Sequence, residues 1–113
     1  MSHFRAFEAE ALRLLGTATL GEAVVAAVCR DAELVSCNHS GSGYFLTVRH
    51  HLLPKARAVL SQPMVLGQVG EVVGSYLAFV QDNELMLEYA GTTGVPQNVR
   101  DLPVKVIVQG AAT

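Results

Sequence analysis

The spacing of hydrophobic residues divides the chain into two parts. Before residue 32 they recur every three or four positions, and from Glu33 onward they alternate with polar residues. The first period is that of an amphipathic helix, and the second is that of a strand with one buried face. The pattern therefore predicts helices first and antiparallel strands afterwards.

Two helices are predicted in the first part. Residues 1–16 form the first helix, with Gly16 as its C-terminal stop. Its apolar face carries Phe4, Phe7, Ala11, Leu14 and Leu15. Thr19 and Glu22 have the spacing of a capping box, which predicts the start of a second helix that ends near Arg30.

A first hairpin is predicted from residues 33–39 and 44–50. Its turn contains Gly41 and Gly43, which tolerate positive φ. The expected register pairs His39 with Tyr44, Cys37 with Leu46, and Val35 with Val48.

The segment after this hairpin is less regular. Residues 55–60 are compatible with one or two helical turns. Residues 64–73 form the next predicted strand, in which Gly67 and Gly70 suggest a bulge or a bend.

A second hairpin has the clearest pattern in the chain. Tyr76–Val80 and Leu85–Tyr89 flank the two-residue turn Asp82-Asn83. The expected pairs are Val80 with Leu85, Ala78 with Leu87, and Tyr76 with Tyr89. Both faces of this hairpin are largely apolar, which is typical of a central hairpin or of one at an interface.

These elements together predict an α+β fold. Residues 104–109 add a last strand, so two N-terminal helices would pack on one face of an antiparallel meander sheet of about five strands. A chain of 113 residues is expected to form a single domain, residues 1–113. Two short helices cannot cover both faces of such a sheet, so one face is expected to stay uncovered.

Composition adds a second argument for an uncovered apolar face. Half of the residues are hydrophobic and 16% are charged, against about a quarter charged in an average soluble domain. An alanine-rich compact monomer would explain this, and so would a surface buried between subunits. The second explanation predicts a homodimer.

Charge and cysteine content exclude several classes. The eight Lys and Arg residues form no cluster, which argues against nucleic-acid binding. No apolar segment approaches the ~20 residues of a membrane span, and no signal peptide is expected. Cys29 and Cys37 make no disulfide framework, so a reducing, cytoplasmic compartment is expected.

No catalytic residue, metal site or cofactor is predicted. Cys37 and His39 lie on the same face of one strand, where both could bind a metal ion. His50 lies at the other end of the hairpin, roughly 20 Å from His39, and cannot join them. Cys29 is expected at the C-terminal end of a helix, where the partial negative charge raises the pKa of a thiol. Cys37 is expected to be buried among apolar partners.

The remaining candidate is a ligand-binding set of Tyr44, Arg49 and Glu88. Glu88 lies between hydrophobic residues and needs a partner if that face is buried. Arg49 or Arg100 could supply it, and a structural ion pair is favoured over a catalytic acid.

The chain resembles a family of small bacterial proteins of uncharacterised activity. The resemblance consists of a leading helix with Phe7, Leu14 and Leu15, a turn with Gly41, Gly43, Tyr44 and Phe45, a late hairpin with Leu85, Met86, Leu87 and Glu88, and Pro96, Asn98 and Val99 after it. Residues 90–94 depart from the family, in which this loop is aromatic and acidic. The resemblance implies the helix-then-sheet fold and a bacterial origin, and it implies no activity.

Two functions follow as expectations. The first is a non-enzymatic protein-interaction module that acts as a homodimer, with an immunity or antitoxin-like role toward another protein as one specific version. The second is a small-molecule-binding protein or minor enzyme, with a pocket between helices and sheet or at the dimer seam.

Overall fold

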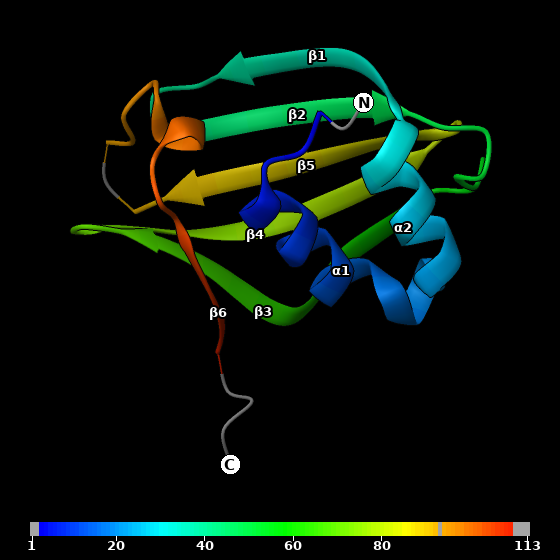
Figure 1. Ribbon diagram of the computed structural model, residues 1–113, viewed down its shortest axis with the longest axis horizontal. Coiled ribbons are helices and arrows are strands. Elements are labelled where there is room, and N and C mark those ends of the chain that lie inside the picture. The colour runs from blue at the N-terminus through cyan, green and yellow to red at the C-terminus, as the bar shows by residue number, and fades with distance from the viewer. Residues whose placement is uncertain (1–2, 93, 110–113) are drawn as a thin grey trace.

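The protein folds into two layers, with helices on one side and an antiparallel sheet on the other (Figure 1). The computed structural model describes residues 3–92 and 94–109. The α+β class and the packing of the helices on one face are confirmed. The first two residues of the predicted first helix lie outside the described residues.

The helices are α1 (Ala6–Leu20) and α2 (Glu22–Asp31). They are separated by Gly21, whose φ of +89° is a conformation that side-chain-bearing residues rarely adopt. Gly16 lies inside α1 rather than at its end, packed against Val25 and Leu60. Thr19 also lies inside α1, so the predicted capping box does not start the second helix.

Six strands form the sheet, where about five were predicted. They are β1 (Glu33–His39), β2 (Gly43–Arg49), β3 (Ala58–Val69), β4 (Val72–Gln81), β5 (Glu84–Gly91) and β6 (Lys105–Gln109). Their spatial order is β1-β2-β5-β4-β3-β6. The meander expectation fails at β2, which pairs with β5 rather than with the next strand in the chain. A short 3₁₀-helix, η1 (Val99–Asp101), precedes β6.

The hairpin of β4 and β5 has the predicted register. Val80 pairs with Leu85, Ala78 with Leu87, and Tyr76 with Tyr89. Asp82 and Asn83 have φ values of 55° and 64°, as the first and second central residues of a type I′ turn require.

The hairpin of β1 and β2 is predicted correctly at its turn and incorrectly at its open end. His39 pairs with Tyr44 and Cys37 with Leu46. The register then shifts between Leu34 and Ser36, so that Leu34, rather than Val35, faces Val48. A bulge of this kind inserts one residue into a strand and disturbs the hydrophobic alternation only slightly, so the sequence pattern did not reveal it.

The strand β3 starts earlier than predicted. It begins at Ala58, so residues 55–60 form no helical turn, and it ends before a turn at Gly70 (φ +58°). The irregularity lies between Leu60 and Val65, whereas Gly67 is in regular register opposite Gly74. A Cβ at Gly67 would meet the ring of Tyr76 at 2.7 Å, so this glycine makes room for an aromatic ring rather than a bend.

The core lies between the sheet and the helices. Leu12 and Leu15 of α1 and Val25 and Val28 of α2 are buried there. The sheet contributes the alternate residues of its central strands: Tyr44, Leu46, Val48, Leu60, Val65, Tyr76, Ala78, Val80, Leu85, Leu87 and Tyr89. None of the helices in the described part of the chain has the length and apolar character that crossing a membrane requires.

Candidate functional site

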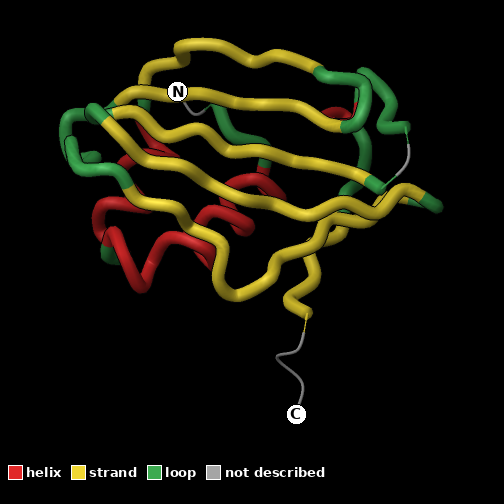
Figure 2. Tube along the Cα trace, turned by 180° about the vertical axis from the view of Figure 1, so that it is seen from behind, coloured by secondary structure: helices red, strands yellow, loops and turns green. Residues whose placement is uncertain are grey.

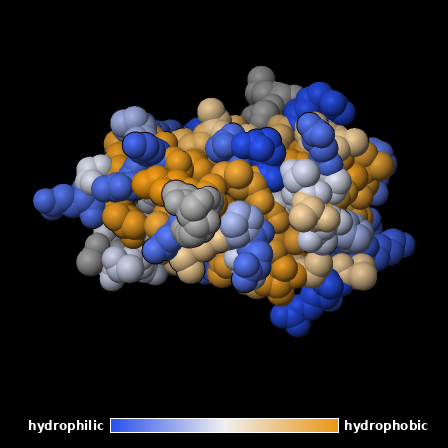
Figure 3. All heavy atoms as spheres, turned by 90° about the horizontal axis from the view of Figure 1, so that it is seen from below, coloured by the Kyte–Doolittle hydropathy of each residue, from blue (hydrophilic) through white to orange (hydrophobic). Residues whose placement is uncertain are grey.

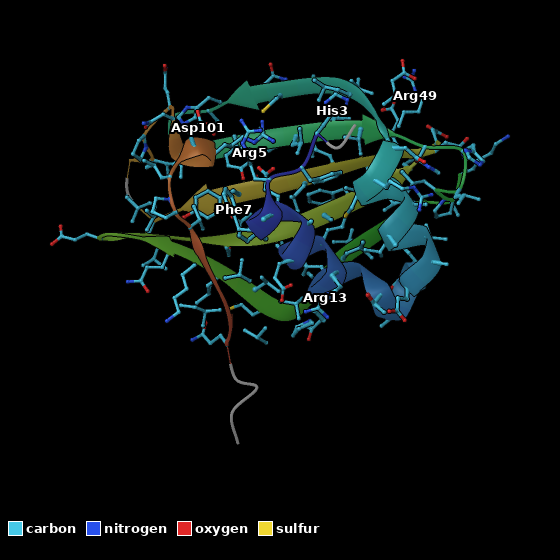
Figure 4. All side chains as sticks on the ribbon, in the orientation of Figure 1. His3, Arg5, Phe7, Arg13, Arg49 and Asp101 are labelled. Carbon is cyan, nitrogen blue, oxygen red and sulfur yellow. The ribbon has the colours of Figure 1, made fainter. Side chains whose placement is uncertain are left out.

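The three residues predicted to bind a ligand lie on opposite faces of the sheet. Tyr44 is buried on the face that the helices cover, whereas Arg49 and Glu88 belong to the other face by the alternation of β2 and β5. Arg49 Nη2 donates to Glu84 at 2.6 Å, so the expected pair with Glu88 is not formed. The sheet itself therefore separates Tyr44 from the other two residues. Figure 4 shows Arg49 at the end of the sheet remote from Arg5 and Asp101.

A buried ion pair between Glu8 and Arg100 lies beside Tyr44. Arg100 donates from Nε to Oε2 at 2.7 Å and from Nη2 to Oε1 at 2.8 Å. The hydroxyl of Tyr44 donates to Oε2 at 2.5 Å, and the backbone N–H of Arg5 donates to Oε1 at 2.7 Å. The Glu8 side chain has no exposure to solvent, and these four hydrogen bonds replace the water that its carboxylate would otherwise bind. The hydrogen bonds from Arg100 to Glu8 raise the pKa of Arg100.

Periodicity in α1 contains the signal for this buried pair. Glu8 follows Phe4 by four residues and precedes Leu12 by four, so it occupies the stripe of α1 that faces the core. The predicted apolar face was right at Phe4, Ala11 and Leu15, which are buried, whereas Phe7 and Leu14 are only half-buried. Arg100, the partner of Glu8, was considered only as one of two possible partners of Glu88, the other being Arg49.

Three tyrosines form a row on the same face of the sheet. Tyr44, Tyr89 and Tyr76 are directly in register on β2, β5 and β4, with ring centroids 5.8 Å and 4.9 Å apart. Burial raises the pKa of all three hydroxyls, which keeps them neutral at physiological pH. Tyr89 donates to the carbonyl of Gly67 at 2.8 Å, and the Tyr76 hydroxyl has no hydrogen-bond partner within the described residues.

A small hollow of about 240 Å³ opens next to the ion pair. Its lining comes from the N-terminal segment, β1, β2 and the region of η1: Arg5, Cys37, His39, Tyr44, Gln97, Arg100 and Asp101. The charges in it are already matched, because Arg5 Nη2 bonds to Asp101 at 3.0 Å (Figure 4) and Arg100 bonds to Glu8. The hollow offers polar contacts without an unpaired charge.

The thiol and imidazole in this hollow are placed differently from expectation. Cys37 is exposed rather than buried, and its Sγ lies 3.7 Å from Nη1 of Arg100. His39 accepts the backbone N–H of Gly41 at Nδ1, so its Nε2 carries the hydrogen that it donates to the carbonyl of Pro96 at 3.1 Å. With both ring nitrogens engaged, His39 holds the loop and is not free to act as a base.

A second histidine has the same arrangement at the other end of the sheet. His50 accepts from the backbone N–H of Leu52 at Nδ1 and donates from Nε2 to Asp31 at 2.7 Å. The hydrogen bond from His50 lowers the pKa of Asp31. This contact connects the C-terminal end of α2 to the end of β2. Among the described residues, no group of three or more His, Cys, Asp or Glu side chains is placed to bind a metal ion.

Cys29 has the environment of an unreactive thiol. It lies near the end of α2, half-buried, and burial raises the pKa of its thiol as expected in direction. A raised pKa lowers the thiolate fraction at neutral pH, which disfavours nucleophilic or metal-binding chemistry.

The remaining feature is the sheet face turned away from the helices. Figure 2 shows that face from behind the molecule, with no helix in front of the strands. We call this surface the open face and define it by the half-buried outward residues of β2, β4 and β5: Phe45, Thr47, Leu77, Phe79, Met86 and Glu88. Most of these side chains are apolar, which is unusual for a sheet surface left to solvent.

The open face has an apolar centre that crosses four strands. Thr47, Met86, Phe79 and Val59 follow one another in register on β2, β5, β4 and β3. Val59 is 49% exposed, and Met64 further along β3 is 54% exposed. Figure 3 looks from below at the edge of the sheet and the helices, with the open face seen side-on, and shows hydrophobic surface interspersed with hydrophilic residues there.

Comparison with known proteins adds no constraint on the function. Neither a family model, nor a curated protein, nor a solved structure matches the chain. The family resemblance therefore remains a prediction.

Proposed function

We propose that this protein is a non-enzymatic interaction module that forms a homodimer through its open face. The observation that carries the proposal is the apolar row of Met86, Phe79 and Val59 on a sheet surface that the helices leave uncovered. An apolar centre with a polar margin is the usual anatomy of a protein interface. The margin here includes the ion pair of Arg49 and Glu84.

The sheet side that contains the open face is large enough for a stable interface. The whole outward side of the six-stranded sheet, with strands ~4.8 Å apart and about 26 Å long, covers roughly 750 Å² in projection, and the open face is its centre. A standard interface buries about 800 Å² on each partner. Face-to-face packing of two such sheets would remove most of the exposed apolar area in one closed contact.

The polar groups described above support a binding role rather than catalysis. Glu8 and Arg100 form an ion pair with each other, and both ring nitrogens of His39 and of His50 take part in hydrogen bonds. A dimer of this kind would act by binding, and blocking another protein, as immunity and antitoxin proteins do, is one form of that role. The helix layer would remain available for such a partner.

The solution mass tests this proposal. Light scattering on untagged protein over a tenfold concentration range should give the mass of a dimer. Phe79→Asp introduces a charge at the apolar centre and should give a monomer. The matched control is Ala23→Asp, an exposed position in the first turn of α2, which should stay dimeric. A wild-type protein that is monomeric throughout this range would refute the proposal.

A second candidate is supported by the hollow beside Tyr44. Arg5 and Arg100 line it, and although Asp101 and Glu8 already pair with them, the guanidinium of Arg5 keeps N–H groups that those contacts do not use, so small carboxylates and phosphates are the ligands to test. A panel of such anions should raise the melting temperature if the hollow binds one of them, and Gln97→Ala should reduce that rise. An unchanged melting temperature across the panel would exclude this function.

A further inference from the structure

Two charged side chains, one on the open face and one beside it, have no partner among the described residues. Glu88 lies in register between Phe45 of β2 and Leu77 of β4. Arg57 lines a hollow of about 310 Å³ together with Phe79 and Met86. Within the residues that the structure describes, neither Glu88 nor Arg57 takes part in a hydrogen bond or an ion pair.

These two charges cannot pair within one chain. Arg57 precedes Val59 by two residues, and Val59 pairs with Phe79, so Arg57 lies level with Gln81. Glu88 lies level with Leu77, four residues away along the strands and two strands across. These steps correspond to ~13 Å and ~10 Å, which is too far for direct contact.

The geometry of a face-to-face dimer resolves this separation. When two copies of one face pack together, the two-fold axis lies in the plane between them. Each residue then faces the position that mirrors its own across that axis. The point halfway between Glu88 and Arg57 falls on β4 at Phe79, since Phe79 is midway between Leu77 and Gln81 and β4 is midway between β5 and β3.

We propose that in the dimer Glu88 of each copy forms an ion pair with the partner's Arg57. This inference rests on the proposed function, and it specifies how the two copies are oriented. An axis that passes over Phe79 stacks the apolar centre on itself and places one ion pair on each side of it. With this axis, Glu88 of each copy faces the partner's Arg57. The two contacts are equivalent by symmetry, and each brings opposite charges together.

Charge reversal at either position tests the pairing. E88R sets the introduced guanidinium of one copy against the partner's Arg57 at both contacts, and R57E places two acids together at both contacts. We expect each variant alone to dimerise about 100-fold more weakly than the wild type. Sedimentation over a wide concentration range measures this change.

Mixing the two variants gives the decisive result. In a dimer of one E88R chain and one R57E chain, one contact joins the two introduced side chains and the other joins the two native ones, so both again join opposite charges. We expect this heterodimer to regain an affinity within about tenfold of the wild type, and native mass spectrometry identifies it because the two chains differ in mass. The control mixture replaces E88R with Glu71→Arg, which changes an exposed charge at the turn between β3 and β4. Its heterodimer with R57E keeps one contact between two acids, so it should bind more weakly than the heterodimer of E88R and R57E.

The outcomes separate this inference from the proposed function. A wild-type dimer with E88R and R57E still dimeric alone would overturn the pairing and leave self-association intact. Two variants that are monomeric alone and remain monomeric when mixed would also overturn the pairing. A monomeric wild type would overturn both, and the open face would then be a surface for a different protein.

Discussion

Glu8 lies where a helix normally places a hydrophobic residue. Its carboxylate is fully buried and accepts four hydrogen bonds, two of them from Arg100. A buried pair of this kind stabilises little when compared with hydrophobic residues, but it is costly to break because one charge is left without a partner. The pair also joins α1 to η1, two elements far apart in the sequence.

We predict that Glu8→Ala lowers the free energy of unfolding by about 3 kcal/mol, and that Arg100→Ala does the same. The double variant should cost less than the sum, because the second substitution removes the charge that the first left unpaired. Urea denaturation measures all three values. Glu10→Ala, on the same helix in an exposed pair with Arg13, is the control and should change stability by less than about 1 kcal/mol. Additive losses would contradict the coupling.

Asp31 gives a pH-dependent contribution. Its hydrogen bond from His50 lowers its pKa in the folded state, so this stabilisation is present above the ordinary pKa of an aspartate, ~3.9, and is lost as the pH falls below it. We expect Asp31→Asn to be less stable than the wild type at neutral pH, with the difference shrinking toward pH 3. Chemical denaturation across this range measures the difference. Glu71→Gln, at an exposed turn, should follow the wild-type curve.

Residue-scale features were the least predictable from sequence. Glu8 could have been found, because it shares the stripe of Phe4 and Leu12, but a lone acid in a helix is normally solvated. Its partner Arg100 lies in an irregular segment whose path no periodicity describes. Exposure of Cys37 was also missed, because β1 is an edge strand and its core-side residues extend beyond the helices.

At the scale of elements, the accuracy of prediction followed the turns. The turn and register of the β4–β5 hairpin were predicted correctly, because Asp82 and Asn83 tolerate positive φ and so fix a two-residue loop, although both strands extend further than predicted. The hairpin of β1 and β2 was right only up to its bulge. In β3, Gly67 was interpreted as a sign of a bulge or a bend, because sequence cannot distinguish a glycine that distorts a strand from one that makes room for an aromatic ring.

Gly67 and Gly74 are paired on β3 and β4 beneath the tyrosine row. A Cβ on Gly74 would lie 2.5 Å from Cζ of Tyr89, whose ring is buried and held by a hydrogen bond to Gly67. We predict that Gly74→Ala lowers the free energy of unfolding by about 1–3 kcal/mol through overpacking. Thermal or urea denaturation measures this loss.

The chain offers a matched control for that substitution. A Cβ on Gly94 would meet no atom within 4 Å, and its φ lies outside the positive range. Gly94→Ala should therefore leave stability nearly unchanged. Equal losses from Gly74→Ala and Gly94→Ala would mean that backbone freedom, and not space for the Tyr89 ring, explains the glycine at position 74.

At the scale of the whole molecule, the sequence predicted the layers and missed the strand order. Helices before strands, and too few helices to cover two faces, are enough to predict one open face. The pairing of β2 with β5 was not predictable, because Val48 and Leu85 meet only after the chain has made the excursion through β3 and β4. Hydrophobic alternation selects the face of each strand and leaves its neighbours undetermined.

A homodimer that buries the open face couples folding to association, and this gives a final prediction. Dissociation precedes or accompanies unfolding, so the melting temperature should rise with protein concentration. For a chain of this size we expect about 3 °C for each tenfold increase. Calorimetry over a hundredfold range measures this slope. The slope should vanish in Phe79→Asp, whose unfolding involves one chain, and it should persist in Ala23→Asp. A concentration-independent melting temperature in the wild type would mean that the apolar row over Met86, Phe79 and Val59 is not buried by a second copy.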